Sequence, residues 1–191
     1  MDSLVIARSE LILGGQKSGK TARAEKLAAA WLAQSDAHKA VYIATAQAWD
    51  AEMGERIARH RADRAQRVPR MQTVEEPHDL AGAIARHGAA DTLLVVDCLT
   101  LWLTGLLMPV SEGNRPLAPG KWTSGAPIFI ANCAGPLVVV SNEIGLGVIP
   151  MGRETRAFVD ALGVLNQEVA AVCERVTFMA AGQPLILKGK A

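Results

Sequence analysis

The chain has 191 residues, with 20 Lys+Arg against 19 Asp+Glu and a formal net charge of +1. Half of the residues (50%) are hydrophobic and 20% are charged, which is typical of globular proteins and excludes a largely disordered chain. The balanced charge disfavours a binder of nucleic acid or of an anionic membrane. This length suits one domain with a sizeable core, and we expect a single domain over residues 1–191.

The cysteines and the first residues favour a cytoplasmic protein. Cys98, Cys133 and Cys173 form no C-x-x-C pair, which fits a reducing compartment and offers no zinc site. Residues 1–10 lack the basic start and long apolar middle of a signal peptide. No stretch approaches the roughly 20 apolar residues that a spanning helix needs. We therefore expect a cytoplasmic protein without a membrane span.

Apolar runs and more polar segments alternate along the chain. The apolar runs predict strands at 11–14, 40–45, 71–74, 92–97, 136–141, 176–180 and 185–187. The segments between them predict helices at 18–34, 50–66, 77–87, 99–108 and 153–173. The run TLLVVD at 92–97 is typical of a parallel strand covered on both faces. The pattern predicts a three-layer α/β domain with a mostly parallel sheet and a terminal antiparallel strand pair around residues 182–184.

One segment, 109–127, interrupts this alternation. It carries four prolines, at 109, 116, 119 and 127, and glycines at 113, 120 and 125, with Gly105 just before it. Because prolines and glycines break regular structure, we expect a long loop over 109–127.

The first predicted strand leads into a glycine-rich phosphate-loop motif. GGQKSGKT at 14–21 matches G-x-x-x-x-G-K-[ST] between a strand and a helix, a context that makes a chance match in a glycine-rich turn improbable. Lys20 is expected to bridge the β and γ phosphates of a nucleotide, and Thr21 to place its hydroxyl on Mg²⁺. The motif makes the expected architecture a P-loop nucleotide-binding fold, with nucleotide contacts from Gly14, Gly15, Gln16, Lys17, Ser18, Gly19, Lys20 and Thr21.

An acidic residue ends the buried strand at 92–97. A phosphate loop usually works with such a residue, so Asp97 is the candidate to hold Mg²⁺ directly or through water. The alternative is a strand-end Asp that caps the following helix.

The predicted helix at 50–66 is basic and carries one histidine. Arg56, His60 and Arg64 share one helix face because they are four residues apart. Such a face suits a triphosphate, and a neutral imidazole is a competent nucleophile at phosphorus. On spacing alone, a solvated charged face with a surface histidine is the better interpretation.

Several segments together resemble one enzyme family over nearly the whole chain, from residue 11 to 189. They are the phosphate loop, IATA at 43–46, EMGERIARH at 52–60, TVEEP at 73–77, LLVVDCLTLWLTGLL at 93–107, SNEIGLGVIP at 141–150 with RETRAF at 153–158, and FMAAGQPLILKG at 178–189. This set resembles the bifunctional adenosylcobinamide kinase / adenosylcobinamide-phosphate guanylyltransferase family of cobalamin biosynthesis. Thr104-Gly105 departs from the Thr-Asn that is common in that family.

The resemblance implies two reactions on a corrinoid substrate. ATP or GTP would phosphorylate adenosylcobinamide, and GMP from GTP would pass through a guanylylated histidine to the cobinamide phosphate, giving adenosylcobinamide-GDP. By position, His60 matches the histidine that carries GMP. The resemblance further implies a homo-oligomer, with a trimer as one form, and nucleotide contacts at Ala44, Thr45, Ala46, Arg61, Ala62, Asp63, Arg64, Glu75 and Asp97.

Other functions remain as alternatives. A small-metabolite kinase without a covalent histidine would use the same phosphate loop and Asp97. A GTP-dependent switch is disfavoured because the chain lacks the N-K-x-D element that reads guanine, and a nucleic-acid motor lacks its basic charge and length. Asn142 and Glu143 follow a predicted strand, either as active-edge residues or as a polar cap on the next turn.

Overall fold

The computed structural model describes residues 4–48, 50–108 and 125–190. The strands are β1 (Ser9–Gly14), β2 (Lys39–Ala44), β3 (Met71–Glu75), β4 (Thr92–Asp97), β5 (Leu137–Val140), β6 (Arg175–Ala180) and β7 (Gln183–Lys188). The helices are α1 (Lys20–Gln34), α2 (Ala51–Arg67), α3 (Leu80–His87), α4 (Leu99–Leu107), α5 (Ala126–Ala131) and α6 (Arg153–Val172).

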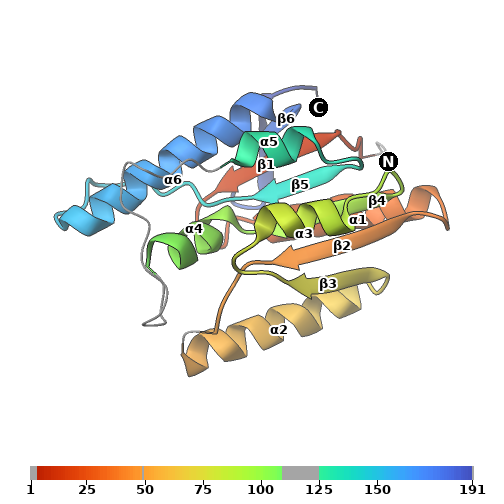
Figure 1. Ribbon diagram of the computed structural model, residues 1–191, viewed down its shortest axis with the longest axis horizontal. Coiled ribbons are helices and arrows are strands. Elements are labelled where there is room, and N and C mark those ends of the chain that lie inside the picture. Colours follow the sequence, from red (N-terminus) through yellow and green to blue (C-terminus); the bar gives the residue numbers. More distant parts are fainter. Residues whose placement is uncertain (1–3, 49, 109–124, 191) are drawn as a thin grey trace.

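The strands form one seven-stranded sheet in the order β3-β2-β4-β5-β1-β6-β7. All neighbouring strands pair in parallel except β6 and β7, which are antiparallel. In Figure 1 the helices α3, α5 and α6 lie in front of the sheet and α1 lies behind it. The predicted three-layer α/β architecture with its terminal antiparallel pair is confirmed.

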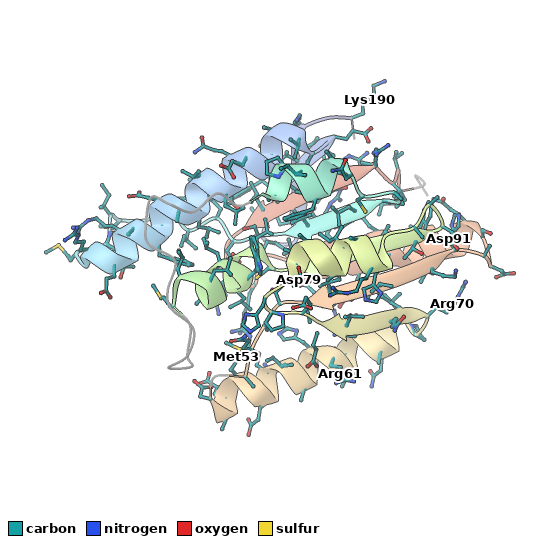
Figure 2. The ribbon with its side chains drawn as sticks, viewed as in Figure 1. Met53, Arg61, Arg70, Asp79, Asp91 and Lys190 are labelled. Carbon is teal, nitrogen blue, oxygen red and sulfur yellow. The ribbon has the colours of Figure 1, made fainter. Side chains whose placement is uncertain are left out.

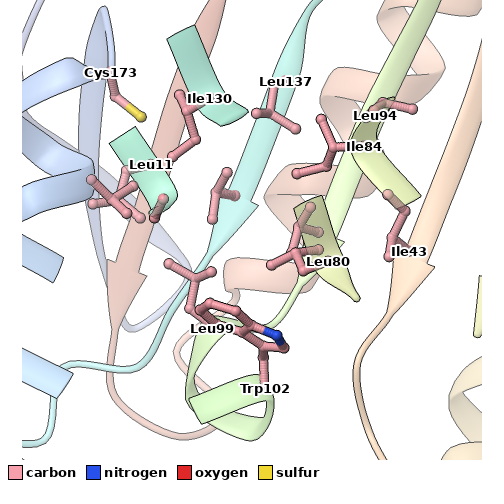
Figure 3. Close-up of a cluster of buried hydrophobic side chains, with 14 of the residues drawn as sticks. Leu11, Ile43, Leu80, Ile84, Leu94, Leu99, Trp102, Ile130, Leu137 and Cys173 are labelled. Carbon is pink, nitrogen blue, oxygen red and sulfur yellow. The ribbon is translucent and has the colours of Figure 1, made fainter. Parts of the chain in front are cut away.

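The two faces of the sheet bury separate apolar clusters, because side chains of successive strand residues point to opposite faces. Leu11, Ile43, Leu94 and Leu137 face α3 to α6, where they pack with Leu80, Trp102 and Ile130 (Figure 3). Ile12, Tyr42, Val95 and Val138 face α1 and pack against its Ala24, Leu27 and Ala28. Both clusters hold the parallel strands in register, which fixes where their carboxyl ends stand.

Two predictions at the chain's turns are wrong. The loop expected over 109–127 falls mostly outside the described residues, but its last part does not: Gly125 caps α5, and Pro127 lies in its first turn. Proline is tolerated there because the first N–H groups of a helix have no partner within it. The expected turn at 182–184 is instead Ala181-Gly182, with φ of 50° and 77°, so Gln183 and Pro184 already belong to β7. Proline is acceptable there because β7 is an edge strand.

Within the described residues, no helix has the length and apolar character that crossing a bilayer requires. The three cysteines are buried free thiols that form no disulfide.

Candidate functional site

The phosphate loop leaves β1 and enters α1 through backbone conformations that favour glycine. Gly14 and Gly19 have φ of 148° and 102°. A Cβ at Gly14 would overlap the carbonyl oxygen of Met179, and one at Gly19 would lie 3.1 Å from Cα of Gly182. The loop is thus packed against the β6–β7 hairpin, and Gly182 N donates to Ser18 O at 2.9 Å.

The ammonium of Lys20 lies inside this loop. Its Nζ donates to Gly14 O at 2.9 Å and to Gly15 O at 2.6 Å, and the residue is 8% exposed. Burial lowers the pKa of Lys20, and the negative charge of Asp97 opposes that shift. A cation held among backbone carbonyls is suited to exchange them for phosphate oxygens, which are stronger acceptors.

Asp97 connects the loop to the neighbouring strands. Its Oδ2 accepts hydrogen bonds from Thr21 Oγ1 and from the Tyr42 hydroxyl, each at 2.7 Å. Burial, and then the neighbouring Asp97 carboxylate, raise the pKa of Tyr42, so the phenol keeps the proton that it donates. The alternative of an Asp97 cap is wrong, because Cys98 is the N-cap of α4 and makes no side-chain cap bond.

The segment after β2 lies at the same edge of the sheet. Thr45 N donates to Asp97 O at 3.2 Å, and Thr45 Oγ1 donates to Cys98 O at 2.7 Å. Ala44 is the register partner of Asp97, and Ala46 follows two residues later. The structure therefore brings the loop at 14–21, the end of β2 and Asp97 together at the carboxyl ends of the strands, where ligands bind in open α/β sheets.

The helix α2 carries His60 along the β3 edge of the sheet (Figure 1). Asp50 caps it, with Oδ1 accepting from Met53 N at 2.7 Å. His60 is exposed and lies one turn before Arg64, the buried residue of α2. Partial desolvation lowers the pKa of His60, Arg56 lowers it further, and Asp97 opposes both. The lowered pKa favours the neutral form of His60.

The basic side chains around His60 are largely paired within the protein. The guanidinium of Arg64 lies 3.7 Å from the centre of the Tyr42 ring, and its Nε donates to Thr73 Oγ1 at 3.2 Å. Arg61 Nη1 lies 3.5 Å from Glu75 Oε1, at the β3 side of α2 (Figure 2). Arg67 pairs with Glu25 and with Asp63. The expected nucleotide contacts at Arg61, Ala62, Asp63, Arg64 and Glu75 thus lie along α2 and the end of β3.

We expect Arg56→Gln to raise the pKa of His60 toward its ordinary value of 6.5. Removing a nearby positive charge makes the imidazolium less costly, so the ring protonates at higher pH. Titration of the His60 ring protons by NMR measures this shift, with Arg153→Gln on the remote helix α6 as the matched control. A His60 pKa unchanged by Arg56→Gln would contradict the electrostatic cause.

Asn142 and Glu143 act as local anchors. Glu143 Oε1 accepts from Gly145 N at 2.7 Å, as expected for a cap on its own turn. Glu143 N also donates to Gly14 O at 3.1 Å, and Asn142 O accepts from Asn166 Nδ2 at 3.1 Å. The segment both caps a turn and lies against the phosphate loop.

Sequence reasoning missed Tyr42, which bonds Asp97 in the site, and Glu25, which joins α1 to α2 beside the site. Tyr42 lies in a strand that was predicted to be buried. Because a buried tyrosine hydroxyl usually needs a hydrogen-bond partner, its position could have indicated a polar neighbour. Glu25, which is 3% exposed, had no local signal, because its partner Arg67 is 42 residues away.

The chain is similar to known proteins over nearly its whole length. The sequence model described as cobinamide kinase / cobinamide phosphate guanyltransferase matches residues 10–187. The bifunctional adenosylcobalamin biosynthesis protein CobP of Pseudomonas aeruginosa is 47% identical over 186 residues, which cover 95% of this chain and 98% of that protein. The protein of the same description named CobU from Salmonella typhimurium is 33% identical over 184 residues, covering 90% and 95%, and that of Escherichia coli is 31% identical over the same lengths. The chain belongs to the cobinamide kinase / cobinamide phosphate guanyltransferase family.

Proposed function

We propose that the protein phosphorylates adenosylcobinamide with ATP or GTP, and then transfers GMP from GTP through His60 to the cobinamide phosphate. The observation that carries this proposal is the meeting of Lys20, Thr21 and Asp97 at one sheet edge, with α2 anchored beside them. Arg64, one turn after His60, contacts Tyr42, and Tyr42 donates to Asp97. These two contacts link α2 to the candidate metal-binding carboxylate. The proposed small-molecule partner is the corrinoid substrate. We also propose that the protein is cytoplasmic and forms a homo-oligomer.

The residues at the loop suit a Mg²⁺-bound triphosphate. Thr21 Oγ1 and Asp97 Oδ2 are hydroxyl and carboxylate oxygens 2.7 Å apart, the donor types that Mg²⁺ prefers. Ser18 Oγ is buried without a hydrogen-bond partner in the described part of the chain, as expected of a group that awaits a phosphate oxygen. Thr21 and Asp97 would hold the ion, which when bound neutralises negative charge on the phosphate oxygens.

In the kinase step the hydroxyl oxygen of the cobinamide side arm attacks the γ-phosphorus. The new P–O bond replaces the bond to the bridging oxygen, the nucleoside diphosphate leaves with that electron pair, and the hydroxyl proton goes to solvent. Lys20 and the N–H groups of the loop stabilise the negative charge that spreads over the transferring group. His60 takes no part in this step.

In the transfer step a neutral nitrogen of His60 attacks the α-phosphorus of GTP. A P–N bond forms, the bond to the bridging oxygen breaks, and pyrophosphate leaves. An oxygen of the cobinamide phosphate then attacks the same phosphorus, the P–N bond breaks, and the imidazole returns to its neutral form. The lowered pKa of His60 keeps the attacking nitrogen free of a proton near neutral pH.

The proposal is tested by incubating the protein with Mg²⁺ and GTP labelled at the α-phosphate. We expect a protein-bound label that is acid-labile and base-stable, that maps to the peptide containing His60, and that moves to added cobinamide phosphate. A protein that phosphorylates cobinamide but never takes up the label would be the simple small-metabolite kinase instead.

Glu75 is proposed to read the guanine base, because a carboxylate accepts hydrogen bonds from its N–H groups. Its side chain is 61% exposed and only loosely paired with Arg61, so it is available to a ligand. We expect Glu75→Ala to weaken GTP use in labelling by about tenfold, the value of one charged hydrogen bond, with ATP use in the kinase step unchanged. The KM for each nucleotide measures this, with Glu154→Ala on α6 as control. A variant that keeps its GTP preference would exclude this role.

A further inference from the structure

The helix that carries His60 is held to the protein by charged side chains rather than by an apolar stripe. Arg64 is the single buried residue of α2, all of whose residues are described. On the same side, Met53 and Ile57 are only partly buried. An amphipathic surface helix normally packs an apolar face on the core, whereas the residue that α2 buries most deeply is an arginine. Its placement therefore depends on a few specific ion pairs.

The shortest of these pairs joins α2 to α1. Arg67 Nη1 lies 2.7 Å from Glu25 Oε2, and the Glu25 side chain is 4% exposed. Arg67 Nη2 also lies 3.2 Å from Asp63 Oδ2, which fixes the direction of the guanidinium. Burial raises the pKa of Glu25, and the charges of Arg67 and Arg64 oppose that shift.

The spacing on both helices connects this pair to the reacting groups. Glu25 lies four residues after Thr21 on α1, and Arg67 lies seven residues after His60 on α2. Residues four and seven apart lie on one face of a helix. The Glu25–Arg67 contact therefore connects α2, and with it His60, to the phosphate-loop helix one turn after Thr21.

We propose that Glu25 and Arg67 are positioning residues for the guanylyl transfer, which set the imidazole of His60 at the nucleotide held by the phosphate loop. This inference rests on the proposed function. Because the kinase step uses the loop and Asp97 without His60, the pair matters for the transfer and not for phosphorylation. A misplacement of about 1 Å at a reacting group slows a reaction by about 10²-fold. Loss of the pair would misplace His60 in this way, whereas the loop and Asp97, which serve the kinase step, would keep their positions.

The test compares both activities in Arg67→Gln, Glu25→Gln and the double variant. At saturating GTP we expect His60 labelling to slow by about 10²-fold in each single variant, with the kcat of cobinamide phosphorylation within about twofold of the wild type. The double variant should be no slower than either single one, because both remove the same contact. Arg67→Lys, which keeps the charge, should recover most of the rate, and Lys26→Gln, one residue after Glu25 and exposed, is the control.

Hydrogen exchange gives a second readout that needs no turnover. Arg67 is half exposed, so we expect Arg67→Gln to fold. In this variant the amide hydrogens of α2 should exchange faster, while the exchange rates of α1 and β4 stay as in the wild type. Labelling of Arg67→Gln at the wild-type rate, or an equal loss of both activities, would overturn the inference alone. A wild type that takes up no label would instead overturn the transfer through His60, and the inference with it.

Discussion

Replacing Lys20 by alanine is expected to lower both the kinase and the guanylylation rates by about 10³-fold, the scale of losing one preorganised charge at a transferring phosphate. Its ammonium lies at the centre of the phosphate loop, bonded to the carbonyls of Gly14 and Gly15. Both proposed reactions bind the triphosphate in this loop. Loss of the Lys20 charge should therefore slow both reactions, not one of them alone. Initial rates of phosphorylation and of His60 labelling measure the effect.

Lys26→Ala is the matched control, since Lys26 lies on the same helix but is exposed. The loop conformation of Lys20→Ala is checked by its thermal stability, because the alanine removes the hydrogen bonds to the carbonyls of Gly14 and Gly15. Retention of either activity within tenfold of the wild type would show that the triphosphate of that reaction binds elsewhere.

The elements that the sequence predicted best are those with strong local patterns. The run at 92–97 became β4 with the predicted bounds, because a continuous apolar segment between turns has one low-energy arrangement in a three-layer fold. The helix α5 was missed because it has only six residues and begins with Pro127, next to a segment rich in helix breakers. A short helix owes its stability to packing, here of its Ala126 and Ile130 in the cluster that includes Leu137, which a local pattern does not reveal.

The candidate site likewise has parts that a local sequence pattern predicts and parts that it does not. The loop at 14–21 and Asp97 were predictable, because the motif specifies a backbone shape and the strand end specifies an edge of the sheet. The basic face of α2 was judged suitable for a triphosphate, with a solvated face as the better interpretation on spacing alone, whereas Arg64 lies on Tyr42 and Arg67 pairs with Glu25. Arg70, beyond the end of α2, donates to the carbonyls of Leu32, Asp36 and His38. Such pairings join residues far apart in sequence, and helical spacing carries no information about them.

These pairings change the electrostatic character of the site. With Arg64 and Arg67 bound within the protein, Arg56 and Arg59 are the arginines of α2 that make no ion pair or hydrogen bond in the described part of the chain. Both also lower the pKa of His60. The same two charges therefore favour the neutral imidazole and, in the proposed transfer, are available to the phosphates of GTP.

His60→Ala is expected to remove the covalent label and to lower GMP transfer by at least about 10³-fold, while cobinamide phosphorylation stays within about twofold of the wild type. The alanine removes the nitrogen that would bond to phosphorus, and no other nucleophile replaces it in the proposed route. The proposed kinase step needs only the loop, Thr21 and Asp97. Among the described contacts, α2 reaches the neighbouring Tyr42 and Glu25 through Arg64 and Arg67, not through His60. The two activities should therefore separate in this one variant.

His87→Ala is the matched control, because His87 ends α3 near the amino-terminal side of β4, away from the site. Labelling with α-phosphate-labelled GTP and phosphorylation with γ-phosphate-labelled ATP are measured on the same preparations, so that a folding defect would appear as a loss of both. A label that persists in His60→Ala would mean that another residue carries GMP. A parallel loss of phosphorylation would mean that the histidine helix belongs to the kinase site as well, since His60 is exposed and its side chain makes no hydrogen bond or ion pair among the described residues.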